Sequence, residues 1–120
     1  MLMKDVFGNY VIQKMFEYGS LNQRKQLFKD LQGRMFDLSC NQYGSRVVQK
    51  ALEVLPTSLQ DELVDEIRVE ILACVEDANG NHVVQKIVES INSEKVQFIV
   101  ESFKGKVYEM SVHQFGCRVI

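Results

Sequence analysis

One short pattern returns along this chain at a fixed spacing, and that spacing limits the possible folds more than any other feature. The segment Gly-Asn-Tyr-Val-Ile-Gln-Lys begins at Gly8, and related segments begin at Gly44, Gly80 and Gly116, each 36 residues after the one before. Apolar positions and a glutamate that follows the pattern keep the same register between copies. Equal steps with matched polar and apolar positions indicate internal repeats, in which each unit buries its apolar face against its neighbours.

Each 36-residue unit is predicted to consist of helices joined by short turns. Apolar residues follow each pattern glycine at helical spacing, as in the segment from Val47 to Leu55. A second amphipathic stretch at 58–69 places Leu59, Leu63 and Ile67 on one face. No segment shows the alternation of a strand. We therefore expect an all-α fold, in which the repeated helices stack into an α-solenoid.

Composition excludes several classes of protein. The chain has 120 residues, of which 46% are hydrophobic and 25% charged, with a single proline, so it is neither disordered nor collagen-like. The longest apolar run, Ile71–Val75, is too short to span a bilayer, so no membrane partner is expected. Three cysteines without metal-like spacing favour reduced thiols in an intracellular protein over a disulfide framework or a metal site.

The helix after each pattern glycine separates into an apolar and a polar side. At about 100° per residue, Val11, Ile12, Met15 and Phe16 fall on the apolar side, which we expect to be core. The opposite side is expected to be exposed and repeats in kind. Its members are Asn9, Tyr10, Gln13 and Lys14 in the first unit, Ser45, Arg46, Gln49 and Lys50 in the second, and Asn81, His82, Gln85 and Lys86 in the third.

The chemistry of this polar side suits unpaired nucleic-acid bases. Residues four apart lie on one helix face, so the paired amide or hydroxyl groups can bind a single planar edge. The next position holds Tyr10, Arg46, His82 or Arg118, each a planar group that can stack on a base, for about 1–3 kcal/mol per base. For one unit alone, solvated surface residues are an equal explanation. The repetition across four units favours base recognition.

A formal net charge of −2 argues against nucleic-acid binding until the distribution is considered. Seven of the sixteen acidic residues lie within 61–77, on helices that a solenoid can turn outward, whereas the pattern helices carry lysine and arginine. Glu17, Glu53 and Glu89 dilute that basic character. We expect recognition through bases more than through phosphates, and hence a shallow salt dependence.

The segments Asn-Tyr-x-x-Gln, Ser-Arg-x-x-Gln, Asn-His-x-x-Gln and Cys-Arg, 36 residues apart, resemble the Pumilio-homology (PUF) RNA-binding repeats over essentially the whole chain. They are most similar to about repeats two to five of a Pumilio-type domain. The resemblance implies a right-handed α-solenoid of three-helix, armadillo-like repeats, with the second helix of each repeat lining a concave RNA-binding face. It also implies a single-stranded RNA partner, no enzymatic activity, no cofactor and no small-molecule substrate.

Carried over by position, the resemblance assigns roles to individual residues. Tyr10, Arg46, His82 and Arg118 would stack on bases, and the base edges would be contacted by Asn9 and Gln13 (uracil), Ser45 and Gln49 (adenine), Asn81 and Gln85 (uracil), and Cys117 (provisionally adenine). Read antiparallel, this is 5′-AUAU-3′, part of the UGUANAUA elements in mRNA 3′ untranslated regions. The implied biology is cytoplasmic: recruitment of repression or deadenylation factors, giving translational repression or mRNA decay.

Residues 1–120 are expected to form a partial Pumilio-homology domain whose first and last repeats are incomplete. Alone they should be marginally stable and associate through their ends, because terminal units lack a covering neighbour. Two alternatives stay open: a protein-binding solenoid of the HEAT or armadillo type, and a degenerate nucleolar PUF relative with little sequence preference. His113 and Cys117 find no third ligand or catalytic partner, and Cys40 and Cys74 are expected to be core residues.

Overall fold

The computed structural model describes residues 2–90, 97 and 101, and no strand occurs among them. A short 3₁₀ turn, η1 (Leu2–Lys4), comes first. The elements that follow are α1 (Gly8–Tyr18), α2 (Leu21–Leu31), α3 (Met35–Ser39), α4 (Gly44–Val54), α5 (Thr57–Ile67), the 3₁₀ turn η2 (Arg68–Glu70), α6 (Ile71–Val75) and α7 (Gly80–Ser90). The predicted all-α fold is confirmed.

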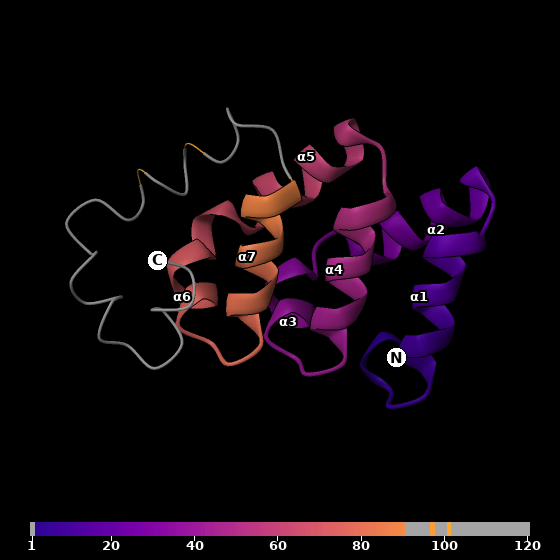
Figure 1. Cartoon of the computed structure of the whole chain (residues 1–120), viewed down its shortest axis with the longest axis horizontal. Coiled ribbons are helices and arrows are strands. Elements are labelled where there is room, and N and C mark those ends of the chain that lie inside the picture. The colour runs from indigo at the N-terminus through magenta and orange to yellow at the C-terminus, as the bar shows by residue number, and fades with distance from the viewer. Residues whose placement is uncertain (1, 91–96, 98–100, 102–120) are drawn as a thin grey trace.

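The helices repeat with the 36-residue period of the sequence. A short helix is followed by an eleven-residue helix that starts at the pattern glycine and then by a third helix, as in α3, α4 and α5. Helices α1, α4 and α7, which we call the motif helices, lie side by side and pack in that order (Figure 1). This stacking of equivalent helices is an α-solenoid, as the repeat predicts.

The pattern glycine is required by a close approach at the start of each motif helix. A Cβ atom at Gly44 would lie 2.7 Å from the carbonyl oxygen of Leu38, and one at Gly80 would lie 2.6 Å from that of Cys74. The preceding turns are fixed by side-chain caps: Asn41 Oδ1 accepts from the backbone N–H of Gly44 at 2.8 Å, and Asp77 Oδ1 does the same for Gly80. The short helix and the motif helix are therefore held together at van der Waals distance.

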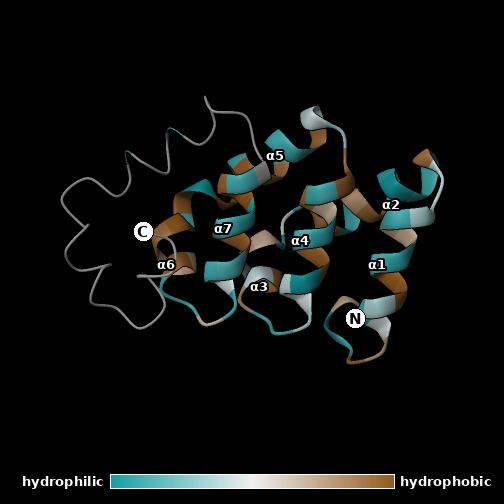
Figure 2. Ribbon diagram, in the orientation of Figure 1, coloured by the Kyte–Doolittle hydropathy of each residue, from teal (hydrophilic) through white to brown (hydrophobic). Residues whose placement is uncertain are grey.

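The core runs between the helices of successive units. In α5, Leu63, Val64 and Ile67 are fully buried, as the amphipathic pattern predicts, and hydrophobic and hydrophilic stretches alternate along the motif helices (Figure 2). Val11 is an exception, because it was predicted to be core but is 56% exposed, whereas Val47 at the same register position is fully buried. The difference arises because α1 packs against α4, whereas no described helix covers the opposite side of α1.

Both described cysteines are free thiols, and Cys74 is buried in the core as predicted, whereas Cys40 is half-buried. Burial, reinforced by the nearby Asp77 carboxylate, raises the pKa of the Cys40 thiol to about 11. Burial likewise raises the pKa of Cys74. Within 2–90, the helices are too short or too polar to cross a membrane.

Candidate nucleic-acid interface

The three motif helices present one continuous row of polar side chains, which we call the motif face. Its members are Tyr10, Gln13, Lys14 and Glu17 from α1, Arg46, Gln49, Lys50 and Glu53 from α4, and His82, Gln85 and Lys86 from α7. The structure therefore brings together residues of three repeats that lie 36 positions apart in the chain.

Three of the four residues predicted to stack on bases lie in the described part of the chain, and these three are exposed on this face. Tyr10 is 54% exposed, and Arg46 and His82 are exposed as well. The Arg46 guanidinium donates a hydrogen bond from Nη1 to the Tyr10 hydroxyl at 3.2 Å. The groups predicted to stack on bases in the first and second repeats are thus neighbours on the motif face.

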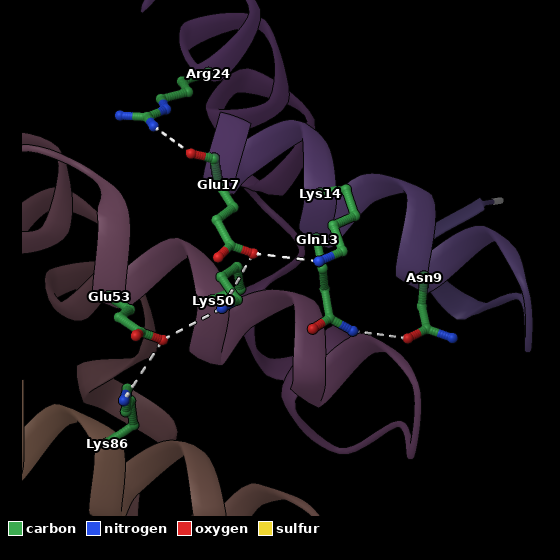
Figure 3. Close-up of polar contacts among 8 residues, drawn as sticks. All are labelled: Asn9, Gln13, Lys14, Glu17, Arg24, Lys50, Glu53 and Lys86. Atoms are coloured by element: carbon green, nitrogen blue, oxygen red, sulfur yellow. Dashed lines mark hydrogen bonds and ion pairs between the residues drawn. The ribbon is translucent and has the colours of Figure 1, made fainter. Parts of the chain in front are cut away.

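Asparagine and glutamine form a fixed pair in the first and third units. Gln13 Nε2 donates to Asn9 Oδ1 at 2.9 Å (Figure 3). The Asn9 amide in turn donates to the carbonyl oxygens of Asp5 and Val6 at 2.8 and 2.9 Å. The third unit repeats this geometry: Gln85 donates to Asn81 at 2.8 Å, and Asn81 donates to the carbonyl oxygens of Asp77 and Ala78, both at 2.9 Å.

The expectation that Asn9, Ser45 and Asn81 are exposed is wrong. Asn9 and Asn81 are completely buried and Ser45 is 4% exposed. The physical reason is that carbonyl groups of the preceding turn need donors, and a short polar side chain in the first helical turn reaches back to them. Contact of these three residues with a base edge remains a prediction, whereas the partner glutamines are half-buried and reach the surface.

The second unit differs from the other two. Ser45 Oγ donates to the Gln42 carbonyl at 3.4 Å, a long hydrogen bond, and within 2–90 no hydrogen bond joins Ser45 to Gln49. The Gln49 amide is therefore not oriented in the way that Asn9 orients Gln13. The alternation between an oriented and an unoriented glutamine follows the predicted uracil, adenine, uracil series.

A ladder of ion pairs, none of which was predicted from the sequence, crosses the motif face. Glu17 Oε2 lies 3.8 Å from Lys14 Nζ and 3.8 Å from Lys50 Nζ. Glu53 Oε2 lies 3.7 Å from Lys50 Nζ and 3.8 Å from Lys86 Nζ (Figure 3). The repeat register alone contains the signal, because a lysine and, three residues later, a glutamate recur in each unit.

Two predicted site residues, Cys117 and Arg118, lie outside the described residues, so the fourth unit is not placed. In the part of the chain that is described, no group of three or more His, Cys, Asp or Glu side chains could hold a metal ion. The chemistry of the motif face is therefore that of amides, planar groups and paired charges.

Comparison with known proteins places this face in context. A Pumilio homolog 1 from Xenopus laevis is 50% identical over 119 residues, which are 98% of this chain but 10% of that protein. Pumilio homolog 9 of Arabidopsis thaliana is 34% identical over 99% of this chain and 22% of its own length. The chain thus spans a tenth to about a fifth of these relatives.

Solved structures with the same fold carry RNA. The Puf3 RNA-binding domain bound to a Cox17 RNA 3′ UTR recognition sequence superposes with a TM-score of 0.94 and 48% identity, over 98% of this chain and 33% of that one. PUF-8 in complex with PBE-RNA gives a TM-score of 0.92 and 44% identity, over 98% of this chain and 35% of the other.

The repeat period has a direct counterpart in the family comparison. Residues 1–31, 34–68, 75–102 and 106–120 match the Pumilio-family RNA binding repeat. Because these matches cover most of the sequence and follow the helices that form the motif face, the chain belongs to the Pumilio family of RNA-binding repeat proteins.

Proposed function

We propose that the motif face binds single-stranded RNA in a sequence-specific manner, with one base to each repeat. The observation that carries the proposal is the regular row of surface glutamines and exposed planar groups, in which Tyr10 and Arg46 of consecutive repeats touch at 3.2 Å. Amide edges read bases by hydrogen bonding and planar groups hold them by stacking. The RNA in the complexes of similar domains supports this reading.

The proposed target is 5′-AUAU-3′ within a UGUANAUA element of an mRNA 3′ untranslated region. Gln13 with Asn9 and Gln85 with Asn81 would specify uracil, and Gln49 with Ser45 would specify adenine. The difference between the units supports this assignment, since Asn9 and Asn81 orient their glutamines and Ser45 does not. Tyr10, Arg46 and His82 would stack on the bases, and Cys117 and Arg118 would serve the fourth base.

At the level of the whole protein, we propose cytoplasmic post-transcriptional control. Binding to 3′ untranslated regions would bring repression or deadenylation factors to the mRNA, which would lower translation or shorten the life of the message. The support for this step is the likeness to Pumilio homologues and to domains bound to 3′ UTR RNA. Reporter mRNA half-life with and without the element, together with imaging of the tagged protein, tests both the outcome and the location.

Titration of labelled UGUAUAUA RNA into the full-length protein tests the recognition. In this octamer AUAU occupies positions four to seven, so adenine six faces the second unit and uracil seven faces the first. Changing either base should cost about 1–3 kcal/mol, whereas equal affinity for all single strands would reject sequence-specific reading. No binding at all would favour a protein-binding groove.

Two substitutions test the assignment of single bases. Asn81→Ser gives the third unit the Ser–Gln pair of the second and should move its preference at position five from uracil to adenine. Gln49→Glu with Arg46→Asn should move the preference at position six towards guanine, the pairing implied by the family resemblance. In each case the preference at the other positions is the internal control, and a uniform loss of affinity would contradict the one-base-per-repeat assignment.

A further inference from the structure

The ion-pair ladder on the motif face consists of Lys14, Glu17, Lys50, Glu53 and Lys86, and each of its glutamates contacts a lysine of its own helix and one of the next unit. Figure 3 shows the glutamates between the lysine ammonium groups, beside the Asn9–Gln13 pair. The ladder therefore runs along the same row of helices that offers amides and planar groups to RNA.

The glutamates neutralise most of the positive charge of this surface. The described helices α1, α4 and α7 contain three lysines and one arginine against three glutamates, a formal charge of +1 with His82 neutral. The side chains of Lys50 and Lys86 are only 22% and 25% exposed, and each ammonium group already lies within 3.8 Å of a glutamate carboxylate. An RNA phosphate could form an ion pair with Lys50 or Lys86 only by competing with the glutamate carboxylate that already contacts that lysine.

The ion-pair ladder is expected to contribute little to the free energy of unfolding. Partly exposed ion pairs such as these contribute about 0–1 kcal/mol each. Their effect on an approaching RNA is larger, because every phosphate paired with a lysine adds affinity that is independent of sequence and strongly dependent on salt. Unpaired lysines on the motif face would increase the affinity for RNA of any sequence that binds with its phosphate backbone towards the helices.

We propose that Glu17 and Glu53 are specificity-determining residues that prevent backbone-inward binding of RNA to the motif face. They hold Lys14, Lys50 and Lys86 in pairs and repel phosphates, so that a strand gains affinity only by turning its bases to the helices. This inference rests on the proposed function, because it requires RNA to lie across α1, α4 and α7.

The test compares two RNAs over a range of salt concentrations in the full-length protein. Fluorescence anisotropy measures the affinity of the wild type and of Glu17→Gln/Glu53→Gln for UGUAUAUA and for an oligo(C) of the same length. The variant raises the formal charge of the motif helices from +1 to +3. Each added phosphate contact should steepen the slope of log K against log[salt] by about 0.7, so two contacts give oligo(C) a relative gain of about 25-fold for a tenfold decrease in salt.

The affinity for UGUAUAUA should change far less, because its phosphates face away from the lysines, so the ratio of the two affinities falls. Lys50→Gln added to the double variant should remove about 0.7 of the extra slope. Glu62→Gln/Glu70→Gln makes the same change in net charge on α5 and η2 and is the matched control.

Three results would overturn the inference: an unchanged slope for oligo(C), an equal gain for both RNAs, or an equal effect of the control variant. Failure of the wild type to bind UGUAUAUA would instead reject the proposed function. Thermal unfolding monitored by circular dichroism shows whether each variant is folded before binding is compared.

Discussion

Replacing Asn81 by aspartate should loosen the start of α7, because this buried side chain is needed as a double donor. Its amide donates to the carbonyl oxygens of Asp77 and Ala78 at 2.9 Å each, and the side chain is completely buried. An ionised carboxylate of nearly the same shape only accepts hydrogen bonds, so in Asn81→Asp two donors would be replaced by oxygens that face carbonyl oxygens.

The magnitude follows from these contacts. Two lost hydrogen bonds account for about 1–3 kcal/mol. The Ala78 carbonyl group loses its side-chain donor, whereas the Asp77 carbonyl still accepts from the backbone N–H of residue 81 at 3.1 Å. Repulsion between the new carboxylate and these carbonyl oxygens adds to the loss, so we expect about 2–4 kcal/mol in total. If the free energy of local opening falls by this amount, the backbone amide hydrogens at the start of α7 should exchange roughly 30- to 700-fold faster. Hydrogen–deuterium exchange with mass spectrometry, on peptides that cover 77–87 of the full-length protein, measures the change directly.

Two controls make the measurement specific. Asn81→Ser keeps one donor, as Ser45 does in the second unit, and should accelerate exchange less than Asn81→Asp. Asn22→Asp makes the same chemical change in the first turn of α2, where the helix dipole acts on the new charge as it does at Asn81, but at an exposed position, and should not accelerate exchange. If Asn81→Asp exchanged as slowly as the wild type, the capping role assigned to this side chain would be refuted.

Three further predictions concern the packing that supports the motif face. Gly44→Ala should destabilise the protein by about 1–3 kcal/mol in denaturant titration, because the new methyl group would lie 2.7 Å from the Leu38 carbonyl oxygen and this overpacking exceeds the gain in helix propensity. Glu66→Ala removes the carboxylate that accepts from the backbone N–H of Gly33 at 2.7 Å and from that of Met35, the first residue of α3, at 2.9 Å. The free energy of unfolding should fall by about 1–3 kcal/mol, measured by denaturant titration. Iodoacetamide should label Cys40 slowly at neutral pH and faster as the pH approaches 11, and rapid labelling at pH 7 would contradict the burial of this thiol. Because the pKa of the thiol is raised in the folded state, its contribution to stability should be complete below pH 9.0 and should be lost as the pH rises from 9.0 to about 11.

Much of the fold can be predicted from the sequence because every unit repeats the same pattern of glycine, polar and apolar residues. The 36-residue period, the glycine that begins each motif helix and the apolar positions of α5 predict an all-α solenoid, and the structure confirms it. Helical periodicity also predicts the face that carries Tyr10, Gln13 and Lys14, because residues on one side of a helix stay together wherever the helix is placed.

Angular position alone misassigned two kinds of residue. Asn9 and Asn81 fall on the polar side of their helices, but they are buried because their amides donate hydrogen bonds to carbonyl groups of the preceding turn. Val11 falls on the apolar side but is exposed, because burial of that position depends on whether another helix covers it, as α1 covers Val47. Periodicity indicates the chemical character of a face but not its neighbours.

The sequence by itself therefore determined the repeat, the helices and the residues available to read bases. Only the tertiary structure decided which of these residues act together. Lys14 and Glu17 are local partners on one helix, but Glu17 reaches Lys50 and Arg46 reaches Tyr10 because adjacent motif helices pack side by side. Contacts between residues 33 to 36 positions apart depend on the distance between packed helices, and no local pattern specifies that distance.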